Sequence, residues 1–139
     1  MKASILIPFY NDLEALPTTL ERLTAAIAAL PFETELLFCD DGSEDGGAEW
    51  LEAQGIPALR VIRGPHIGKG GTLRRGVLAA SGELIFYTDC DLAYGTDVIL
   101  PFLHAVEKNG GIAVGKREKE GYGAYSAFRT CPAEQESWS

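Results

Sequence analysis

Short apolar runs alternate along this chain with segments whose apolar residues recur every three or four positions. The runs are rich in Ile, Leu, Val and Phe and end in polar residues, which is typical of buried strands. They predict five strands, at residues 3–9, 35–39, 59–62, 84–87 and 112–114. Because helical segments separate these strands, we expect β-α-β units that build a mostly parallel α/β sheet flanked by helices on both faces.

The helical segments carry recognisable start and stop signals. The first helix begins near Pro17, a residue suited to the first turn, and Pro31 ends it. Its apolar stripe consists of Leu20, Leu23, Ile27 and Leu30. A short second helix is predicted through Leu51 with Ser43 as its N-cap. Two further helices are predicted at residues 72–80 and 101–109.

The pattern fades after Lys116. Residues 116–120 are charged, and residues 121–139 show no convincing period. A chain of 139 residues is long enough for one domain with a core. We therefore expect one domain at residues 1–117, followed by an irregular or disordered tail at 118–139.

Composition excludes several classes of protein. The net charge of −8 argues against nucleic acid as a partner. No apolar run approaches the roughly 20 residues of a membrane-spanning helix. Three cysteines without a C-x-x-C motif favour a reduced, cytoplasmic setting. The two histidines stand apart from any Cys or His at metal spacing, which makes a zinc site unexpected.

Two carboxylates follow the strand at residues 84–87. Because side chains alternate along a strand, we expect Asp89 and Asp91 to point the same way and Cys90 to point opposite. Paired carboxylates at the end of a buried strand repel each other and lose solvation. A divalent cation between them explains the arrangement. The alternative is a solvated turn that contains two aspartates by chance.

The strand at residues 35–39 also ends in acids, Asp40 and Asp41. The carboxyl ends of parallel strands face one crevice, where open α/β sheets bind ligands. Both acid pairs are therefore expected at the same edge. Taken alone, Asp40 and Asp41 also fit an Asx-type turn that precedes the next helix.

A glycine-rich loop, Gly68-Lys69-Gly70-Gly71, precedes the helix at 72–80. Its backbone N–H groups and the helix dipole suit a phosphate, with Lys69 and Arg74 as counter-charges. We expect Arg75 to face solvent. The spacing is not that of a P-loop, and the alternative is a flexible linker. Cys39 and Cys90 are expected to fill the core rather than act as nucleophiles.

Four motifs in this order resemble those of the family 2 glycosyltransferases of GT-A fold. They are Ile7-Pro8-Phe9-Tyr10-Asn11-Asp12, Cys39-Asp40-Asp41-Gly42-Ser43-Glu44-Asp45-Gly46, Gly68-Lys69-Gly70-Gly71-Thr72-Leu73-Arg74 and Thr88-Asp89-Cys90-Asp91-Leu92. The Gly-Lys-Gly-Gly and Asp-x-Asp-Leu forms look most like the branch that makes polyprenyl- or dolichyl-phosphate sugars. The resemblance covers residues 1–117 and ends at Gly115-Lys116-Arg117.

The resemblance implies roles on the nucleoside side of the site. Pro8, Tyr10 and Asp12 would line the base pocket, with Asp12 standing where the family usually has Glu. Asp40 would contact the nucleobase or ribose, and Asp41 would lie beside it.

It also implies roles on the phosphate side. Asp89 would face the ribose and phosphates, and Asp91 would ligate Mg²⁺ or Mn²⁺. Lys69 and Arg74 would steady the nucleotide, and Arg117 would reach a phosphate of the donor or of a lipid acceptor. A catalytic base is not identifiable, so catalysis would rest on Asp89 and Asp91 through the metal.

The function implied is inverting transfer of a sugar from a UDP- or GDP-sugar, with a polyprenyl or dolichyl phosphate as acceptor. The family's acceptor-binding half is not recognisable, so we expect a GT-A fold truncated on that side, which binds donor and transfers sugar slowly. The alternatives are a non-catalytic nucleotide-sugar-binding fragment, a nucleotidyltransferase and a plain interaction domain. A cytoplasmic location is expected, peripheral to a membrane face if the acceptor is a lipid. A homodimer is left open.

Overall fold

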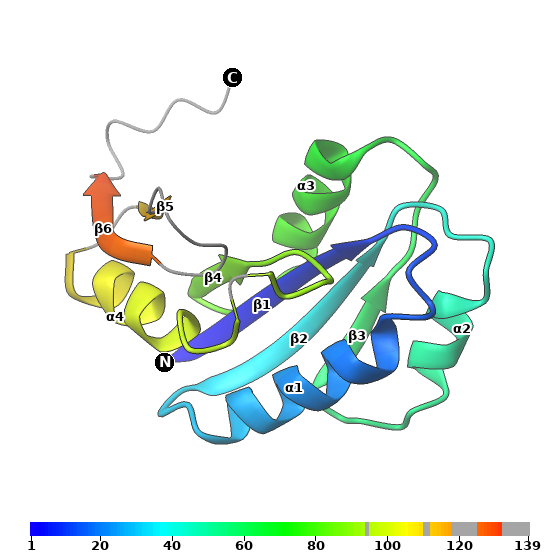
Figure 1. Cartoon of the computed structure of the whole chain (residues 1–139), viewed down its shortest axis with the longest axis horizontal. Coiled ribbons are helices and arrows are strands. Elements are labelled where there is room, and N and C mark those ends of the chain that lie inside the picture. Colours follow the sequence, from blue (N-terminus) through cyan, green and yellow to red (C-terminus); the bar gives the residue numbers. More distant parts are fainter. Residues whose placement is uncertain (94, 110–111, 118–124, 132–139) are drawn as a thin grey trace. The chain divides into compact units, whose positions relative to one another are not determined.

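Four strands form one parallel sheet in the computed structural model. They are β1 (Lys2–Phe9), β2 (Glu33–Asp40), β3 (Leu59–Ile62) and β4 (Leu84–Tyr87), in the order β3-β2-β1-β4 (Figure 1). Every pairing is parallel, so the carboxyl ends of all four strands lie at one edge of the sheet. The predicted parallel α/β architecture is confirmed for these strands.

The structure describes residues 1–93, 95–109, 112–117 and 125–131, the last two ranges by their backbone. It divides the chain into two compact units, Met1–Leu92 and Ala93–Ser139. The first unit contains the four-stranded sheet. The functional boundary expected after residue 117 stays a prediction.

Three helices belong to the first unit: α1 (Leu16–Ala28), α2 (Gly47–Glu52) and α3 (Lys69–Ala79). Figure 1 shows α1 and α3 on opposite sides of the sheet. The predicted helix after Pro17 is confirmed, with Leu20 and Leu23 buried. Ser43 is not the N-cap of α2, because that helix starts four residues later behind Gly46.

The core fills both faces of β1 and β2. Leu6 pairs with Leu37 in the parallel register, and these two pack with Cys39 on the face that carries Leu73 of α3. The neighbouring positions along each strand point to the opposite face because side chains alternate. That face is equally buried and lies under α1; its residues are Ile5, Ile7, Leu36 and Phe38. Burial on both faces explains why these strands read as continuous apolar runs.

β4 was expected to be buried on both faces, but the side chains of one face are exposed. Leu84 is buried, but Ile85 is 40% exposed and Tyr87 is 59% exposed. β4 pairs only with β1 within the four-stranded sheet and so lies at its edge. The prediction of a strand covered on both faces is therefore wrong for Ile85 and Tyr87.

The second unit contains α4 (Ile99–Asn109), β5 (Ile112–Arg117) and β6 (Tyr125–Cys131). β5 and β6 form an antiparallel pair, against which α4 packs. The fifth strand is thus real but belongs to a separate two-stranded sheet. The expectation of irregular structure from residue 118 onward is wrong at Tyr125–Cys131. The remainder of the expected tail lies outside the described residues.

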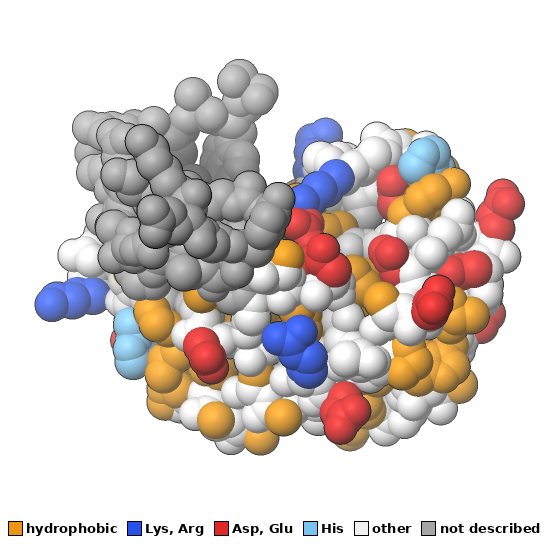
Figure 2. Space-filling view, in the orientation of Figure 1, with side chains coloured by type: hydrophobic (Ala, Val, Ile, Leu, Met, Phe, Trp, Pro, Cys, Tyr) orange, Lys and Arg blue, Asp and Glu red, His pale blue; other side chains and the backbone are white. Residues whose placement is uncertain are grey.

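Acidic side chains are spread over the face of the molecule shown in Figure 2. This distribution agrees with the net charge of −8.

Candidate functional site

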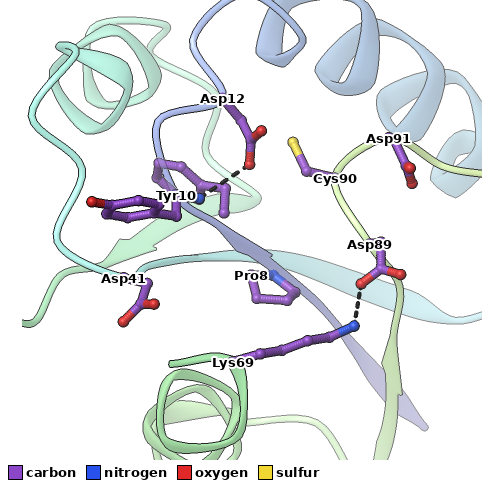
Figure 3. Close-up of a pocket in the computed structure, with 9 residues that line it drawn as sticks. Pro8, Tyr10, Asp12, Asp41, Lys69, Asp89, Cys90 and Asp91 are labelled. Atoms are coloured by element: carbon purple, nitrogen blue, oxygen red, sulfur yellow. Dashed lines mark hydrogen bonds and ion pairs between the residues drawn. The ribbon is translucent and has the colours of Figure 1, made fainter. Parts of the chain in front are cut away.

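A pocket of about 260 Å³ opens at the carboxyl ends of the strands in the first unit. Residues from the ends of β1, β2 and β4 and from the start of α3 line it (Figure 3). The lining residues are Pro8, Phe9, Tyr10, Asp12, Asp41, Lys69, Asp89, Cys90 and Asp91. The pocket thus brings together seven of the predicted site residues: Pro8, Tyr10, Asp12, Asp41, Lys69, Asp89 and Asp91.

Asp89 and Asp91 stand in a turn, not on a strand. β4 ends at Tyr87, and the Leu92 N–H donates to the Asp89 carbonyl at 3.0 Å. This turn directs the Cys90 side chain into the core. The Cys90 carbonyl accepts a hydrogen bond from the Thr19 hydroxyl. Both aspartates nevertheless line the same pocket, while Cys90 is buried. The predicted shared site for the two carboxylates is supported, although strand alternation is not its cause.

The carboxylate oxygens of Asp89 and Asp91 suit a hard divalent cation. Carboxylate oxygens are the protein ligands that Mg²⁺ and Mn²⁺ prefer. Among the residues described, no group of three His, Cys, Asp or Glu side chains gathers into a ready metal cluster. The chain therefore offers Asp89 and Asp91 as a two-carboxylate site, which fits an ion whose other ligands are ligand oxygens and water.

Lys69 forms an ion pair with Asp89 (Figure 3). Its ammonium also lies 5.9 Å from the centre of the Tyr87 ring, over the ring face. Lys69 is the first residue of α3, so the helix start determines where this charge stands. The predicted loop at residues 68–71 is shorter than expected because the helix begins at Lys69.

Asp41 is the best-anchored side chain in the pocket. One of its carboxylate oxygens accepts the Ile67 amide at 2.7 Å and the Thr72 hydroxyl at 2.9 Å. The Gly68 amide donates to both carboxylate oxygens at 3.2 Å, and His66 Nδ1 lies 3.0 Å from Oδ2. Burial raises the pKa of Asp41, but the Ile67, Thr72 and Gly68 hydrogen bonds and His66 outweigh it and lower that pKa.

The same contacts change the expected phosphate loop. Gly68 is the N-cap of α3 with φ +89°, a left-handed value that favours glycine. The anion that meets the Ile67 and Gly68 amides is the protein's own Asp41 carboxylate, which also suits the helix dipole. Those two amides are therefore engaged, and Lys69 is the group of this loop that reaches the pocket.

The structure reverses the expected order of the two acids after β2. Asp40 does not line the pocket, since its carboxylate accepts the Ser43 amide at 2.8 Å and the residue is 4% exposed. Asp41 lines the pocket instead. The expected contact of Asp40 with a base or ribose has no support in this geometry, and its Asx-type turn is the observed role.

Two loops at the pocket rim are joined by hydrogen bonds that link β1 to β2. Asn11 N–H donates to Ser43 Oγ at 2.9 Å, and Asn11 Oδ1 accepts the Glu44 amide at 2.8 Å. Asp45 Oδ2 accepts the Leu13 amide at 2.9 Å. Many residues of the two motifs at the ends of β1 and β2 therefore form the rim of the pocket and do not line it.

Aromatic rings stand at one side of the pocket. Tyr10 stacks on His66, with 4.3 Å between ring centres and 28° between planes. The Tyr10 amide donates to Asp12 Oδ2 at 3.0 Å, which positions both pocket residues. His66 was not among the predicted site residues, because its partners Tyr10 and Asp41 lie far from it in sequence.

The two arginines expected at the site, Arg74 and Arg117, and Arg75, which was expected to face solvent, differ in outcome. Arg74 is exposed and does not line the pocket, and its role stays a prediction. Arg117 belongs to β5 in the second unit, and its side chain lies outside the described residues. Arg75 is not the solvent-facing residue that was expected, since its Nη2 donates to Asp40, Pro65 and Thr72.

The buried cysteines are not nucleophiles. Burial raises the pKa of the Cys39 thiol to about 11. Burial, with Asp12 and Asp91 nearby, raises the pKa of the Cys90 thiol to about 12. Both thiols are protonated at neutral pH, and the thiolate is the reactive form. Their expected role as core residues is confirmed.

The family model for glycosyl transferase family 2 matches residues 4–133. The chain belongs to this family. This match includes the pocket and every predicted site residue.

Curated relatives in the family share part of their length with this chain. It is 36% identical over 118 residues to an undecaprenyl-phosphate 4-deoxy-4-formamido-L-arabinose transferase from Serratia proteamaculans, covering 82% of this chain and 36% of the relative. It is 35% identical over 122 residues to the protein of that name from Proteus mirabilis, covering 85% and 37%. The family 2 chain thus spans little more than a third of these relatives.

Solved structures share the fold. A mannosyltransferase from Pyrobaculum calidifontis in complex with GDP-Man and Mn²⁺ matches with a TM-score of 0.65 at 21% identity, over 84% of this chain and 35% of that one. A glucosyl-3-phosphoglycerate synthase from Mycobacterium tuberculosis, in complex with Mn²⁺, UDP and glucosyl-3-phosphoglycerate, matches with a TM-score of 0.56 at 22% identity, over 78% and 40%. The GT-A fold expected from the motifs is confirmed.

Within the described residues, the helices are all too short or too polar to span a bilayer.

Proposed function

We propose that this family 2 chain binds a nucleotide-diphosphate sugar together with a divalent metal ion and serves as the donor half of a glycosyltransferase. The observation that carries the proposal is the meeting of Asp89 and Asp91 with Lys69 at the carboxyl edge of a parallel sheet. That edge is where open α/β sheets bind nucleotides. The complex of one solved neighbour with GDP-Man and Mn²⁺, and that of the other with UDP and Mn²⁺, support it.

The nucleoside belongs on the β1 and β2 side of the pocket in this proposal. Pro8 and Tyr10 offer apolar faces to a base, and Asp12 is the carboxylate that stands beside them. Carboxylates accept hydrogen bonds from the imide or amine N–H of a base and from ribose hydroxyls. Asp41, which the Ile67 amide and the Thr72 hydroxyl of α3 hold in place, also lines the pocket.

The diphosphate belongs on the β4 and α3 side. Asp89 and Asp91 would hold Mg²⁺ or Mn²⁺, and Lys69 would supply positive charge in the pocket. Arg74, which is exposed and does not line the pocket, is proposed to add positive charge from α3. The metal, when bound, offsets negative charge that develops on the leaving diphosphate. The chain's own contribution is to bind the donor in a fixed orientation, which lowers the entropic cost of reaction.

The acceptor in this proposal is a polyprenyl phosphate, in keeping with the undecaprenyl-phosphate transferases among the relatives. A phosphate oxygen is already ionised at neutral pH, so it attacks the sugar without a strong general base. The proposal therefore asks for no strong general base among the pocket-lining residues that the structure describes. Arg117 is proposed to meet a phosphate, and the reaction to invert the anomeric centre at the cytoplasmic face of a membrane.

The test is a thermal unfolding series with UDP and GDP, each with and without Mn²⁺. A nucleotide at one hundred times its Kd is expected to raise the unfolding free energy by about 2.7 kcal/mol. Asp91→Asn should remove the Mn²⁺-dependent part of this shift without lowering the midpoint of the unliganded protein, because it removes one of two repelling acids. Asp97→Asn, at an exposed position outside the pocket, is the matched control.

No shift with either nucleotide would contradict the proposed site. A large loss of stability in Asp91→Asn would make Asp91 a structural residue of the turn. The acceptor is tested separately with radiolabelled donor and a short-chain polyprenyl phosphate. Label in the lipid that depends on Asp91 supports transfer, whereas label released only as free sugar argues against that acceptor.

A further inference from the structure

The Arg75 side chain is largely buried against segments that carry pocket residues. Its Nη2 donates to the Asp40 carbonyl at 3.3 Å, the Pro65 carbonyl at 3.1 Å and the Thr72 hydroxyl at 3.1 Å. The same nitrogen lies 3.9 Å from Asp41 Oδ1. One guanidinium thus joins the end of β2, the loop before α3 and the first turns of α3.

Gly64 supplies the space that the guanidinium occupies. A Cβ on Gly64 would lie 1.1 Å from Arg75 Nη1 and 2.0 Å from Cζ. The φ of Gly64 is not in the left-handed region, so its backbone accepts other residues. A glycine is required at this position because of the side chain packed against it, and not because of its backbone conformation.

The arrangement is not explained by hydrogen bonding alone. Arg75 Nε and Nη1 are buried and have no hydrogen-bond partner in the part of the chain that the structure describes. Leaving buried donors of a charged group unpaired is unfavourable. Arg75 is also absent from the pocket wall, so it does not meet a ligand there. Its contacts all go to segments that carry pocket residues, Asp41 after β2 and Lys69 at the start of α3.

We propose that Arg75 is a positioning residue that fixes Asp41 and Lys69 relative to each other. In this proposal, the lack of a side chain at Gly64 leaves the space that the Arg75 guanidinium occupies. Asp41 is held by the Ile67 and Gly68 amides, which belong to the loop that Arg75 fastens at Pro65. Loss of the guanidinium would remove the Pro65 link between that loop and the end of β2, which leaves the contacts of Asp41 with His66, Ile67 and Gly68 to hold the loop there. The consequence for nucleotide binding rests on the proposed function, whereas the consequence for the loop does not.

The test is a double-mutant cycle with Arg75→Met and Gly64→Ala. Alanine at 64 must displace the guanidinium, so each single change should remove the same set of contacts. We expect each to speed hydrogen exchange of the Ile67 and Gly68 amides about tenfold and to weaken UDP or GDP binding with Mn²⁺ by a similar factor. The double variant should match either single variant, because Gly64→Ala has nothing left to displace. Arg22→Met, an exposed arginine of α1, is the control and should change neither readout.

Additive effects in the double variant, or unchanged exchange at Ile67 and Gly68 in Arg75→Met, would overturn the proposal. If Arg75→Met fails to fold, Arg75→Lys takes its place. Lysine keeps the positive charge and the aliphatic chain but lacks the planar guanidinium with its several N–H donors. Faster hydrogen exchange at Ile67 and Gly68 is therefore still expected in Arg75→Lys. Exchange as slow as in the wild type would count against the proposal. A wild-type protein that binds neither nucleotide would contradict the proposed function, while the exchange cycle would still decide the role of Arg75.

Discussion

Lys69 and Asp89 form an ion pair that ties the first residue of α3 to the turn after β4. Their side chains are 53% and 47% exposed, so the pair contributes little to stability. Its effect is on the charge of the pocket, where Lys69 is the basic side chain among lining residues that include four aspartates. The positive charge of Lys69 therefore reduces the electrostatic repulsion between the Asp89 and Asp91 carboxylates.

Lys69→Met should separate the two roles of this charge. The unfolding free energy should change by less than about 1 kcal/mol, because exposed ion pairs are weak. Binding of UDP or GDP with Mn²⁺ should weaken about tenfold, since a cation that meets the diphosphate is lost. Binding of Mn²⁺ alone should strengthen, because Asp89 no longer shares its charge with an ammonium. Titration calorimetry measures both affinities.

Lys108→Met, on the exposed side of α4, is the matched control for Lys69→Met. It should leave both affinities unchanged. Weaker binding of Mn²⁺ alone in Lys69→Met would show that Lys69 supports the metal site instead of competing with the metal there.

Asn11 tests how firmly the two rim loops are joined. Its φ is +50°, which costs a residue with a Cβ roughly 1–2 kcal/mol unless its side chain compensates. Both Asn11→Ala and Asn11→Gly lose the acceptor for the Glu44 amide. Alanine also keeps the unfavourable φ, so Asn11→Ala should be the less stable by about 1 kcal/mol in urea unfolding. Equal stabilities would mean that the rim relaxes to another backbone conformation.

Glu35 should govern acid stability from the opposite end of the sheet. It is 5% exposed and accepts hydrogen bonds from Ser4 Oγ at 2.6 Å, and from the Ser81 amide and hydroxyl at 2.7 and 2.8 Å. Burial by itself raises the pKa of Glu35, but the bonds from Ser4, Ser81 and Arg60 outweigh it and lower the pKa to about 2.

A carboxyl whose pKa is lower in the folded protein stabilises the fold above its unfolded pKa. The contribution of Glu35 is thus complete above pH 4.5 and is lost as the pH falls from 4.5 toward 2. Glu35→Gln should cost about 2 kcal/mol at neutral pH and flatten the loss of stability in this range. Denaturant unfolding at several pH values measures both effects. Glu33→Gln, the exposed neighbour on β2, should leave the acid profile of the wild type intact.

The central strands β1 and β2 were predictable because burial on both faces requires a continuous apolar run. Leu59–Ile62 and Leu84–Tyr87 have the predicted bounds, and β2 is longer than predicted at both ends. The pocket was predictable for a related reason, since parallel strands bring Asp41 and Asp89 to one edge whatever their distance in sequence.

The contacts inside the site were not predictable because they join distant residues. Asp41 meets Ile67 and Gly68, 26 and 27 positions away, and no local pattern marks those amides as its partners. The orientation of Arg75 was missed because the buried positions of α3 are Thr72 and Gly76. Small and polar residues on the packed side leave no apolar stripe from which the helix phase can be read.

β1 lies in the middle of the described sheet although it is the first strand to be made. Its hydrogen bonds to β2 are available once residue 40 exists, but those to β4 must await residues 84–87. Over that interval of synthesis, one edge of β1, which is apolar except at Lys2 and Ser4, presents unpaired N–H and C=O groups. Such an edge is a template for pairing with other chains. The strand order that creates the pocket therefore favours aggregation of the chain most strongly before β4 has been made.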